Sequence, residues 1–201
     1  MTVRSTLAHQ YRARLDALRS QLVEQARRLY GDLDPADISA SFDAIAPDIA
    51  RYIEAGQGSA AALSAAFLNA LSEYETDQPA AVQMAPVGVS QKGDPLAVGM
   101  APIAGMILGQ IAAGATVTDA VAYGDYLVSR FADSETVRVA DQTTDDTLAA
   151  EGQRYIGWEG VVSPRACDAC VSANSGTHTP DETLYRHANC GCERIPIFEG
   201  A

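Results

Sequence analysis

The residue types most able to do chemistry are gathered near the C-terminus of the chain. The stretch RACDACVSANSGTHTPDETLYRHANCGCERIP holds all four cysteines and two of the three histidines among 201 residues. Cys167 and Cys170 form one closely spaced pair, Cys190 and Cys192 form a second, and His187 stands three residues before the second pair. Thiolates and imidazoles at such spacings are typical donors of tetrahedral zinc sites. The pattern predicts a zinc ion held by four of these five residues.

Two ligand sets are compatible with the spacing. If the second cysteine pair is locally extended, its two thiolates face the same side, with Gly191 relieving the crowding between them, and four cysteines hold the ion. His187 is then a neighbour of the site. The alternative set takes the first pair, His187 and one cysteine of the second pair. His178, in NSGTHTP, is expected to lie in a loop and not to be a ligand.

The predicted ion is structural and not catalytic. Catalytic zinc sites usually keep one position open for water, whereas four or five candidate ligands fill this shell. Two disulfides would use the same cysteines. However, MTVRSTLAHQYRARL carries charges where a secretory signal has an apolar core, so a reducing cytoplasm and metal-bound thiols are expected.

No enzymatic motif competes with this interpretation. The sequence shows no glycine-rich phosphate loop of the expected form and no Ser–His–Asp order with a nucleophile elbow. Cys190 and His187 could pair as a nucleophile and base, but a cysteine beside three others is more often structural. HANCGC also lacks the second histidine of a His-Asn-His nuclease. The chain is therefore predicted not to be an enzyme and to have no small-molecule substrate.

A long amphipathic helix is predicted to open the chain. Apolar residues recur at spacings of 4-4-3-4-4-3, which indicates one buried stripe on a helix over residues 3–30 that Gly31 ends. The residues of this stripe are Leu7, Tyr11, Leu15, Leu18, Leu22, Ala26 and Leu29.

Two further helices are expected to complete an N-terminal bundle. DPADISASF is a helix start, with Asp34 as cap and Pro35 in the first helical position. Its apolar face continues to about Gly56, and Pro47 is expected to kink or interrupt the helix. A third helix is predicted over residues 59–74.

The second half of the chain begins with a segment of different composition. Residues 77–95 (DQPAAVQMAPVGVSQKGDP) are rich in Pro and Gly and are interpreted as a linker. Residues 95–118 then contain no charge, and their length alone would suit a bilayer span. Because the stretch is rich in Ala and Gly, contains Pro102 and lacks aromatic or basic anchors, a buried core helix is the favoured interpretation.

Two helices and two strands are predicted in the rest. One helix, capped by Thr116 or Thr118, is expected to run to Phe131, and another to cover about 135–151 with Ser134 as cap. YIGWEGVVSP and ERIPIF have the aromatic and β-branched residues of strands on either side of the cysteine cluster.

The predicted fold class is therefore mainly α. Residues 1–76 form the N-terminal helical region, residues 77–95 the Pro/Gly linker, and residues 96–201 a helical region that ends in a small α+β module. The module covers about residues 155–201 and is expected to be stapled by the zinc ion, because so short a segment has few large apolar residues of its own.

Charge is unevenly distributed along the chain. The formal net charge is −12, yet residues 1–30 carry six arginines against two acidic residues, whereas residues 31–82 carry nine acidic residues against Arg51. An acidic protein is repelled by nucleic acid, so any DNA contact has to use the first helix. A solvated helix face is the simpler interpretation. The candidate partner-binding residues are Arg4, Arg12, Arg14, Arg19, Arg27 and Arg28.

The C-terminal residues also resemble those of a known family. Four features occur in order: a strand with Trp158, the cysteine pair in SPRACDAC, a loop with Gly176, and RHANCGCERIP. Together they are similar to the signature of the phage Mu F-like minor head proteins, also called head morphogenesis proteins. The specific resemblance covers about residues 155–196, with a looser one back to about 96. The helices before the signature usually carry an Ala-Arg-Thr-Glu run, which VRVADQTTD replaces with Arg138 nearby. The matching positions are Cys167, Cys170, His187, Asn189, Cys190 and Cys192.

This resemblance implies a minor structural protein of a tailed-phage head, associated with the portal or the capsid interior. Its expected partners are the portal or major capsid protein, with packaged DNA reached through the N-terminal helix. The expected location is the virion, and the host cytoplasm during assembly. Two alternatives remain: a host zinc-ribbon adaptor that presents residues 171–186 to a protein partner, and an ejected phage protein that enters membranes through residues 95–118.

Overall fold

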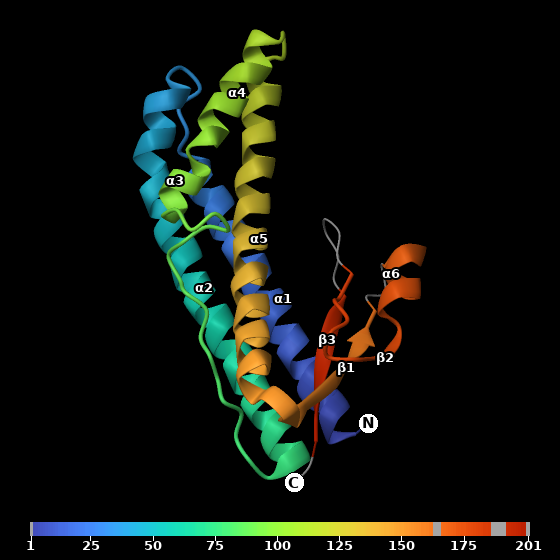
Figure 1. The fold of residues 1–201 in the computed structure, drawn as a ribbon. Helices are drawn as coiled ribbons and strands as arrows, with labels where there is room; N and C mark the ends of the chain where they lie inside the picture. Colours follow the sequence, from blue (N-terminus) through green and yellow to red (C-terminus); the bar gives the residue numbers. More distant parts are fainter. Residues whose placement is uncertain (1, 163–165, 186–191, 200–201) are drawn as a thin grey trace. The chain divides into compact units, whose positions relative to one another are not determined.

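A computed structural model describes residues 2–162, 166–185 and 192–199, and Figure 1 shows its ribbon. The chain is mainly helical with a small antiparallel sheet near the C-terminus, which confirms the predicted fold class at that level. The elements in order are α1 (Val3–Tyr30), α2 (Ile38–Thr76), α3 (Leu96–Met100), α4 (Pro102–Ala112), α5 (Val117–Glu151), a 3-10 turn (Gly152–Arg154), β1 (Tyr155–Val161), α6 (Asp168–Asn174), β2 (Gly176–His178) and β3 (Glu193–Phe198).

The chain divides into two compact units, each of which draws on both halves of the sequence. The core unit consists of residues 11–64 and 84–143. The sheet unit consists of residues 1–10, 65–83 and 144–201 and contains all three strands. The three long helices α1, α2 and α5 contribute residues to both units.

Helix α1 coincides with the predicted helix over residues 3–30. Its stripe is buried at Leu15, Leu22 and Ala26, and the remaining stripe residues are half-buried. The N–H of Gly31 donates to the carbonyl of Arg27 at 2.9 Å, which ends the helix where the sequence predicted. The periodic pattern therefore located both the helix and its buried face.

Helix α2 corrects the prediction of two separate helices, because residues 38–76 form one continuous helix. The cap is Asp37, whose carboxylate accepts the N–H of Ala40 at 3.3 Å, whereas Asp34 accepts the N–H of Ala36 in the preceding turn. Pro47 lies inside the helix. A proline removes one helical hydrogen bond, but the buried residues around it keep the helix packed in the core.

Gly56, predicted to end this helix, has a different role. A Cβ atom at this position would overlap the side chain of Leu22 on α1. The glycine therefore permits a close approach of α1 and α2 within the core unit, in an unbroken helix. A glycine required for packing and one that ends a helix look the same in a sequence.

Helix α5 is likewise one helix where two were predicted. Thr116 caps it as predicted: its hydroxyl oxygen accepts the N–H of Asp119 at 3.1 Å and donates to the Asp119 carboxylate at 2.7 Å. Ser134, the predicted cap of the second helix, instead donates to the carbonyl of Phe131 at 3.1 Å inside the helix. A serine that bonds back to its own helix does not interrupt it.

The uncharged stretch at 95–118 folds as two short helices, α3 and α4, and not as the single helix that was predicted. Pro102 begins α4, where its missing N–H costs nothing. The inner side of this stretch is buried, as expected, whereas Met106 and Leu108 are exposed. Among the described residues, no helix is both long enough and apolar enough to cross a bilayer.

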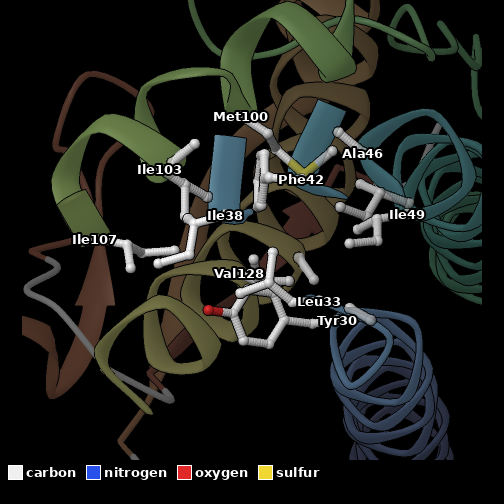
Figure 2. Packing of buried hydrophobic residues seen from close by; sticks show 14 of the residues in the cluster. Tyr30, Leu33, Ile38, Phe42, Ala46, Ile49, Met100, Ile103, Ile107 and Val128 are labelled. Atoms are coloured by element: carbon white, nitrogen blue, oxygen red, sulfur yellow. The ribbon is translucent and has the colours of Figure 1, made fainter. Parts of the chain in front are cut away.

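The hydrophobic core of the core unit lies where α1 to α5 converge (Figure 2). Tyr30, from the end of α1, packs in it and donates its hydroxyl to the carbonyl of Val121 at 2.9 Å. Burial, with a smaller contribution from Asp125, raises the pKa of Tyr30 to about 12. Gly124 on α5 leaves room for that hydroxyl and for Ile107 of α4. The largest fully buried side chains of this core are Phe42, Ile49, Ile53, Met100, Ile107 and Val128.

Residues 78–91, between α2 and α3, contain no helix and are called the strap here (Figure 1). In the sheet unit, the backbone N–H groups of Ala81 and Gln83 donate to Glu151 and Thr147. In the core unit, the N–H of Ala85 donates to Thr143 at 3.1 Å. Two residues of extended chain rise about 6.6 Å and four residues of helix about 6 Å, so in the sheet unit the N–H groups of Ala81 and Gln83 meet α5 residues one turn apart.

Buried and half-buried polar side chains hold the rest of the strap. In the core unit, Gln57 accepts the N–H of Gly88 at 2.8 Å and donates to the carbonyl of Val89 at 3.0 Å. Arg138 also donates to Val89, at 2.7 Å, and Glu135 accepts the N–H of Gln91 at 3.0 Å. Most strap side chains are exposed. The strap is thus held mainly through its backbone.

Glycine substitutions test the packing of α4 against α5. Gly124→Ala should destabilise the protein by about 1–3 kcal/mol, because the new methyl group overlaps Tyr30 and Ile107. Gly109→Ala, at a helical position with open space around it, should stabilise by about 0.5–1 kcal/mol through its better helix propensity. Urea unfolding followed by circular dichroism measures both. If both variants changed the free energy of unfolding in the same direction, this packing would be contradicted.

A second pair of variants tests the strap. Thr147→Val keeps the shape of the side chain but removes the acceptor of the Gln83 N–H, and should cost about 1 kcal/mol. Gln83→Ala keeps that N–H and trims only an exposed side chain, so its unfolding free energy should stay within about 0.5 kcal/mol of the parent. A Thr147→Val protein as stable as the parent would show that the hydrogen bond is unimportant.

Candidate functional site

The cysteine cluster belongs to a module built on the three-stranded sheet of the sheet unit. The strand order is β2-β1-β3, and both pairings are antiparallel. Strands β1 and β3 confirm the two predicted strands, whereas β2 was not predicted. Pro196 lies in the edge strand β3, where a proline is tolerated because one side of the strand has no ladder to complete.

The pairing of β1 with β3 places one of the cysteines at an end of the sheet. Val161, the last residue of β1, pairs with Glu193, the first residue of β3. Cys192 immediately precedes Glu193, and the chain that leaves β1 leads within a few residues to Cys167. The pairing thus places Cys192 next to the end of the sheet at which β1 ends.

Three of the five candidate metal ligands are described. Cys167 is exposed at the residue before α6, Cys170 is fully buried in the first turn of α6, and Cys192 is buried. His187 and Cys190 lie outside the described residues. Within residues 2–162, 166–185 and 192–199, no three Cys, His, Asp or Glu side chains form a metal-binding group. The choice between the two predicted ligand sets therefore stays open.

The centre of the module is Trp158, the single tryptophan of the chain, which is fully buried on β1. Its cross-strand partner is His178, and their rings stack 3.9 Å apart at an angle of 13°. The indole N–H donates to the carbonyl of Glu182 at 3.0 Å. Trp158 therefore contributes both apolar area and an anchor for the loop that follows β2.

His178 lies in strand β2 and not in the predicted loop. Its Nδ1 is 3.4 Å from a carboxylate oxygen of Glu182. Its Nε2 is buried and has no hydrogen-bond partner among the described residues. The prediction that His178 is not a metal ligand stays a prediction.

Helix α6 packs closely on β1 through a glycine. A Cβ atom at Gly160 would overlap the backbone carbonyl of Asn174, the last residue of α6. Asn174 is fully buried, and its side chain makes two hydrogen bonds of 2.8 Å with the backbone of Tyr185, one to the N–H and one to the carbonyl. The loop over residues 179–185 is thus tied to the sheet at Glu182 and to α6 at Tyr185.

A short turn inside this loop is held by the carboxylate of Glu182. The N–H of Thr179 donates to it at 2.6 Å and the Thr179 hydroxyl at 2.9 Å. The backbone hydrogen bond from Thr179, with smaller contributions from its hydroxyl and from His178, lowers the pKa of Glu182. The loop is therefore stabilised by the ionised carboxylate.

The outer edge of β3 is covered by helix residues of the sheet unit. Arg4 of α1 donates to the carbonyl of Ile195 at 3.1 Å and forms an ion pair with Glu75 of α2. Glu75 in turn accepts the N–H of Phe198 at 2.8 Å. These side chains occupy hydrogen-bonding groups that an edge strand otherwise presents to other chains. No local sequence signal links two residues 71 positions apart, so this contact was missed.

Most of the other arginines of α1, predicted as partner-binding residues, have intramolecular contacts as well. In the core unit, Arg19 pairs with Asp133 at 2.7 Å, Arg27 with Asp125 at 2.9 Å, and Arg28 with Glu24 at 3.5 Å. Arg12 is half-buried, and Arg14 is exposed. Exposed pairs of this kind contribute little to stability, so Arg14, Arg27 and Arg28 still present charge to solvent.

Comparison with known proteins gives no relative: no family model, no curated protein and no solved structure matches the chain.

The pKa of Glu182 leads to a pH-dependent prediction. Because folding lowers this pKa, the contribution of the carboxylate is complete above about pH 4.3, the ordinary value for Glu, and is lost as the pH falls through the lower value of the folded state. Glu182→Gln should therefore destabilise the module at pH 7 and make a progressively smaller difference below pH 4. Urea unfolding followed by Trp158 fluorescence measures this difference. A difference that does not vary with pH would contradict the charge-dependent role.

Proposed function

We propose that this chain is a non-enzymatic structural protein of a tailed-phage head, with a structural zinc ion in its C-terminal module. The observation that carries the proposal is the arrangement of that module. The module has three features in the order that the family resemblance implies. These are a strand with a buried Trp158, a cysteine pair at the start of α6, and a final strand that directly follows Cys192.

The donor set suits zinc. Cys170 and Cys192 are both buried, and the β1–β3 pairing places Cys192 next to the end of the sheet from which the chain continues toward Cys167. Soft thiolates favour zinc over hard cations such as Mg²⁺. The remaining two donors are Cys190 and Cys192 together, or His187 with one of them. When bound, the ion supplies cross-links between α6 and the entry to β3.

A structural role also fits what the polar residues around the cysteines do. Asn174, Glu182 and the indole of Trp158 each hold backbone groups of the loop over residues 179–185. A catalytic residue needs a side chain free to meet a substrate. These side chains are engaged in maintaining the fold of the module.

The charge distribution supports a place between DNA and other head proteins. The body of the chain is acidic and the α1 helix carries the exposed Arg14, Arg27 and Arg28. In this proposal, these arginines meet packaged DNA or an acidic patch of the portal or major capsid protein. The protein resides in the virion, at the capsid interior or portal vertex.

The test is the copy number of the chain in gradient-purified particles of the phage or prophage that encodes it, measured by quantitative mass spectrometry against the portal subunit. We expect a fixed ratio at or below that of the portal. Cys170→Ser should reduce incorporation strongly, whereas Val171→Ala, at the exposed neighbouring position, should not. Absence of the wild-type chain from particles contradicts the proposal.

The second candidate is a zinc-ribbon adaptor of the host. It is favoured by one observation: Val171 and Tyr185 are large apolar residues, each nearly half exposed, on the segment predicted to face a partner. An adaptor would be absent from particles and would lose its protein partner on Val171→Asp.

A further inference from the structure

Helices α1 and α5 line an open groove on the surface of the core unit. The groove consists of two adjacent hollows, which share Ser20 and Val23 of α1. The other lining residues are Asp16, Arg19 and Asp133 in one hollow, and Glu24, Arg27, Arg28 and Asp125 in the other. Each hollow thus carries charges of both signs, and a small side chain and an apolar one lie where the two hollows meet.

Four of the α1 residues form one row along the helix. With spacings of four, three and four residues, they are Asp16, Ser20, Val23 and Arg27. Arg19 and Glu24 flank this row. The side chains of Asp16, Glu24 and Arg27 are 55%, 73% and 59% exposed, so another molecule can reach their charges.

The ion pair that Arg27 makes inside the chain does not prevent a second one. Arg27 pairs with Asp125 at 2.9 Å, and exposed pairs of this kind contribute little to stability. A guanidinium has several N–H donors in a planar fork, so Arg27 can keep Asp125 and bind the carboxylate of another molecule at the same time.

The charges on α1 are arranged symmetrically about the midpoint of the row. Asp16 and Arg27 lie equally far from this midpoint on opposite sides and have opposite charges. The same holds for Arg19 and Glu24. When two identical surfaces meet around a two-fold axis, residue i of one meets residue j of the other, and j meets i. An axis through the midpoint would therefore bring each of these carboxylates next to an arginine of a second copy.

We propose that a second copy of this chain docks on this groove, with the two α1 helices antiparallel around a two-fold axis. Asp16 of each copy then pairs with Arg27 of the other at the two ends of the contact. Ser20 and Val23 lie at the axis, where their modest size lets the helices approach to the usual distance of about 8–10 Å. This inference does not depend on the proposed zinc site.

The charge of the groove favours a second copy over nucleic acid. Its lining has four acidic residues against three arginines, a balance that repels a polyanion. A surface with the same pattern in the reverse direction is its complement, and a second copy presents that surface. Of the arginines proposed to meet DNA or another head protein, Arg14 lies on another side of α1 and stays accessible in the pair.

The experiment is sedimentation equilibrium of the full-length protein at micromolar to near-millimolar concentrations. We expect a monomer–dimer equilibrium for wild type. Arg27→Glu and Asp16→Arg should each weaken dimerisation by about tenfold or more, because each places like charges together at both ends of the contact. Arg14→Glu makes the same change of charge on another side of α1, so this matched control should dimerise as wild type does.

Mixing the two variants tests whether the contact joins two copies. In a mixed dimer of Arg27→Glu and Asp16→Arg, both end contacts join opposite charges again. We therefore expect the equimolar mixture to dimerise with an affinity close to that of wild type, whereas each variant alone stays largely monomeric. A change in the stability of either chain could not be repaired by mixing two folded proteins.

Three results would overturn the inference. They are a wild type that stays monomeric over the whole concentration range, which leaves the groove to a different partner, a mixture that does not dimerise, and a loss of dimer in Arg14→Glu as large as in Arg27→Glu. Circular dichroism shows whether each variant is folded. If a charge reversal unfolds the chain, the neutral Arg27→Gln decides the question: weaker dimerisation supports the inference, and wild-type dimerisation overturns it.

Discussion

A buried or half-buried backbone N–H or carbonyl needs a hydrogen-bond partner, and much of this structure is arranged to supply partners outside helices and strands. The strap over residues 78–91, the loop over residues 179–185 and the outer edge of β3 have too few main-chain partners of their own. In each case polar side chains from a neighbouring helix or strand provide the missing groups. The protein thereby orders segments that otherwise lack regular structure.

This requirement accounts for the unusual burial of polar residues in the helices. Thr143 and Thr147 are fully buried on α5, and Gln57 is fully buried on α2. An unpartnered hydroxyl or amide at such positions costs about 1–3 kcal/mol, whereas a partnered one is close to neutral. Their hydrogen bonds to the strap make these polar residues compatible with the interior, and the same bonds hold the strap in place.

The C-terminal module uses the same principle with aromatic and amide groups. Trp158 and Asn174 are fully buried, and the polar group of each forms hydrogen bonds with the backbone of the loop after β2. The hydrophobic contribution of the module is limited, because it is short and has few large apolar residues. In the proposed function, the zinc ion adds the cross-links that this small core lacks.

The sequence predicted those features that depend on local periodicity or composition. The stripe of α1 located a helix to within a residue, and the β-branched and aromatic runs located β1 and β3. The predicted helix end at Gly56 and the predicted helix start at Ser134 were wrong, because a glycine needed for close packing resembles a helix end and a serine that bonds back to its helix resembles a cap. Contacts such as Arg4 with Glu75, or the strap with α5, join residues far apart and leave no local signal.

Of the candidate site, the sequence located the cysteines but not what positions them. The spacing of the cysteine pairs pointed to the region, whereas Asn174, Gly160 and Trp158 acquire their roles only when β1, β2 and α6 are placed together. Their contributions depend on three-dimensional proximity and not on spacing.

The most direct test of the account is the mass of the purified chain under native conditions, compared with its mass after denaturation in a chelator. We predict that the native mass exceeds the denatured mass by one zinc ion less the protons that it displaces. After denaturation, the chain should carry four thiols that can be alkylated. A native mass without metal, together with a denatured chain lighter by four hydrogens, would show two disulfides in place of the zinc site and contradict the account.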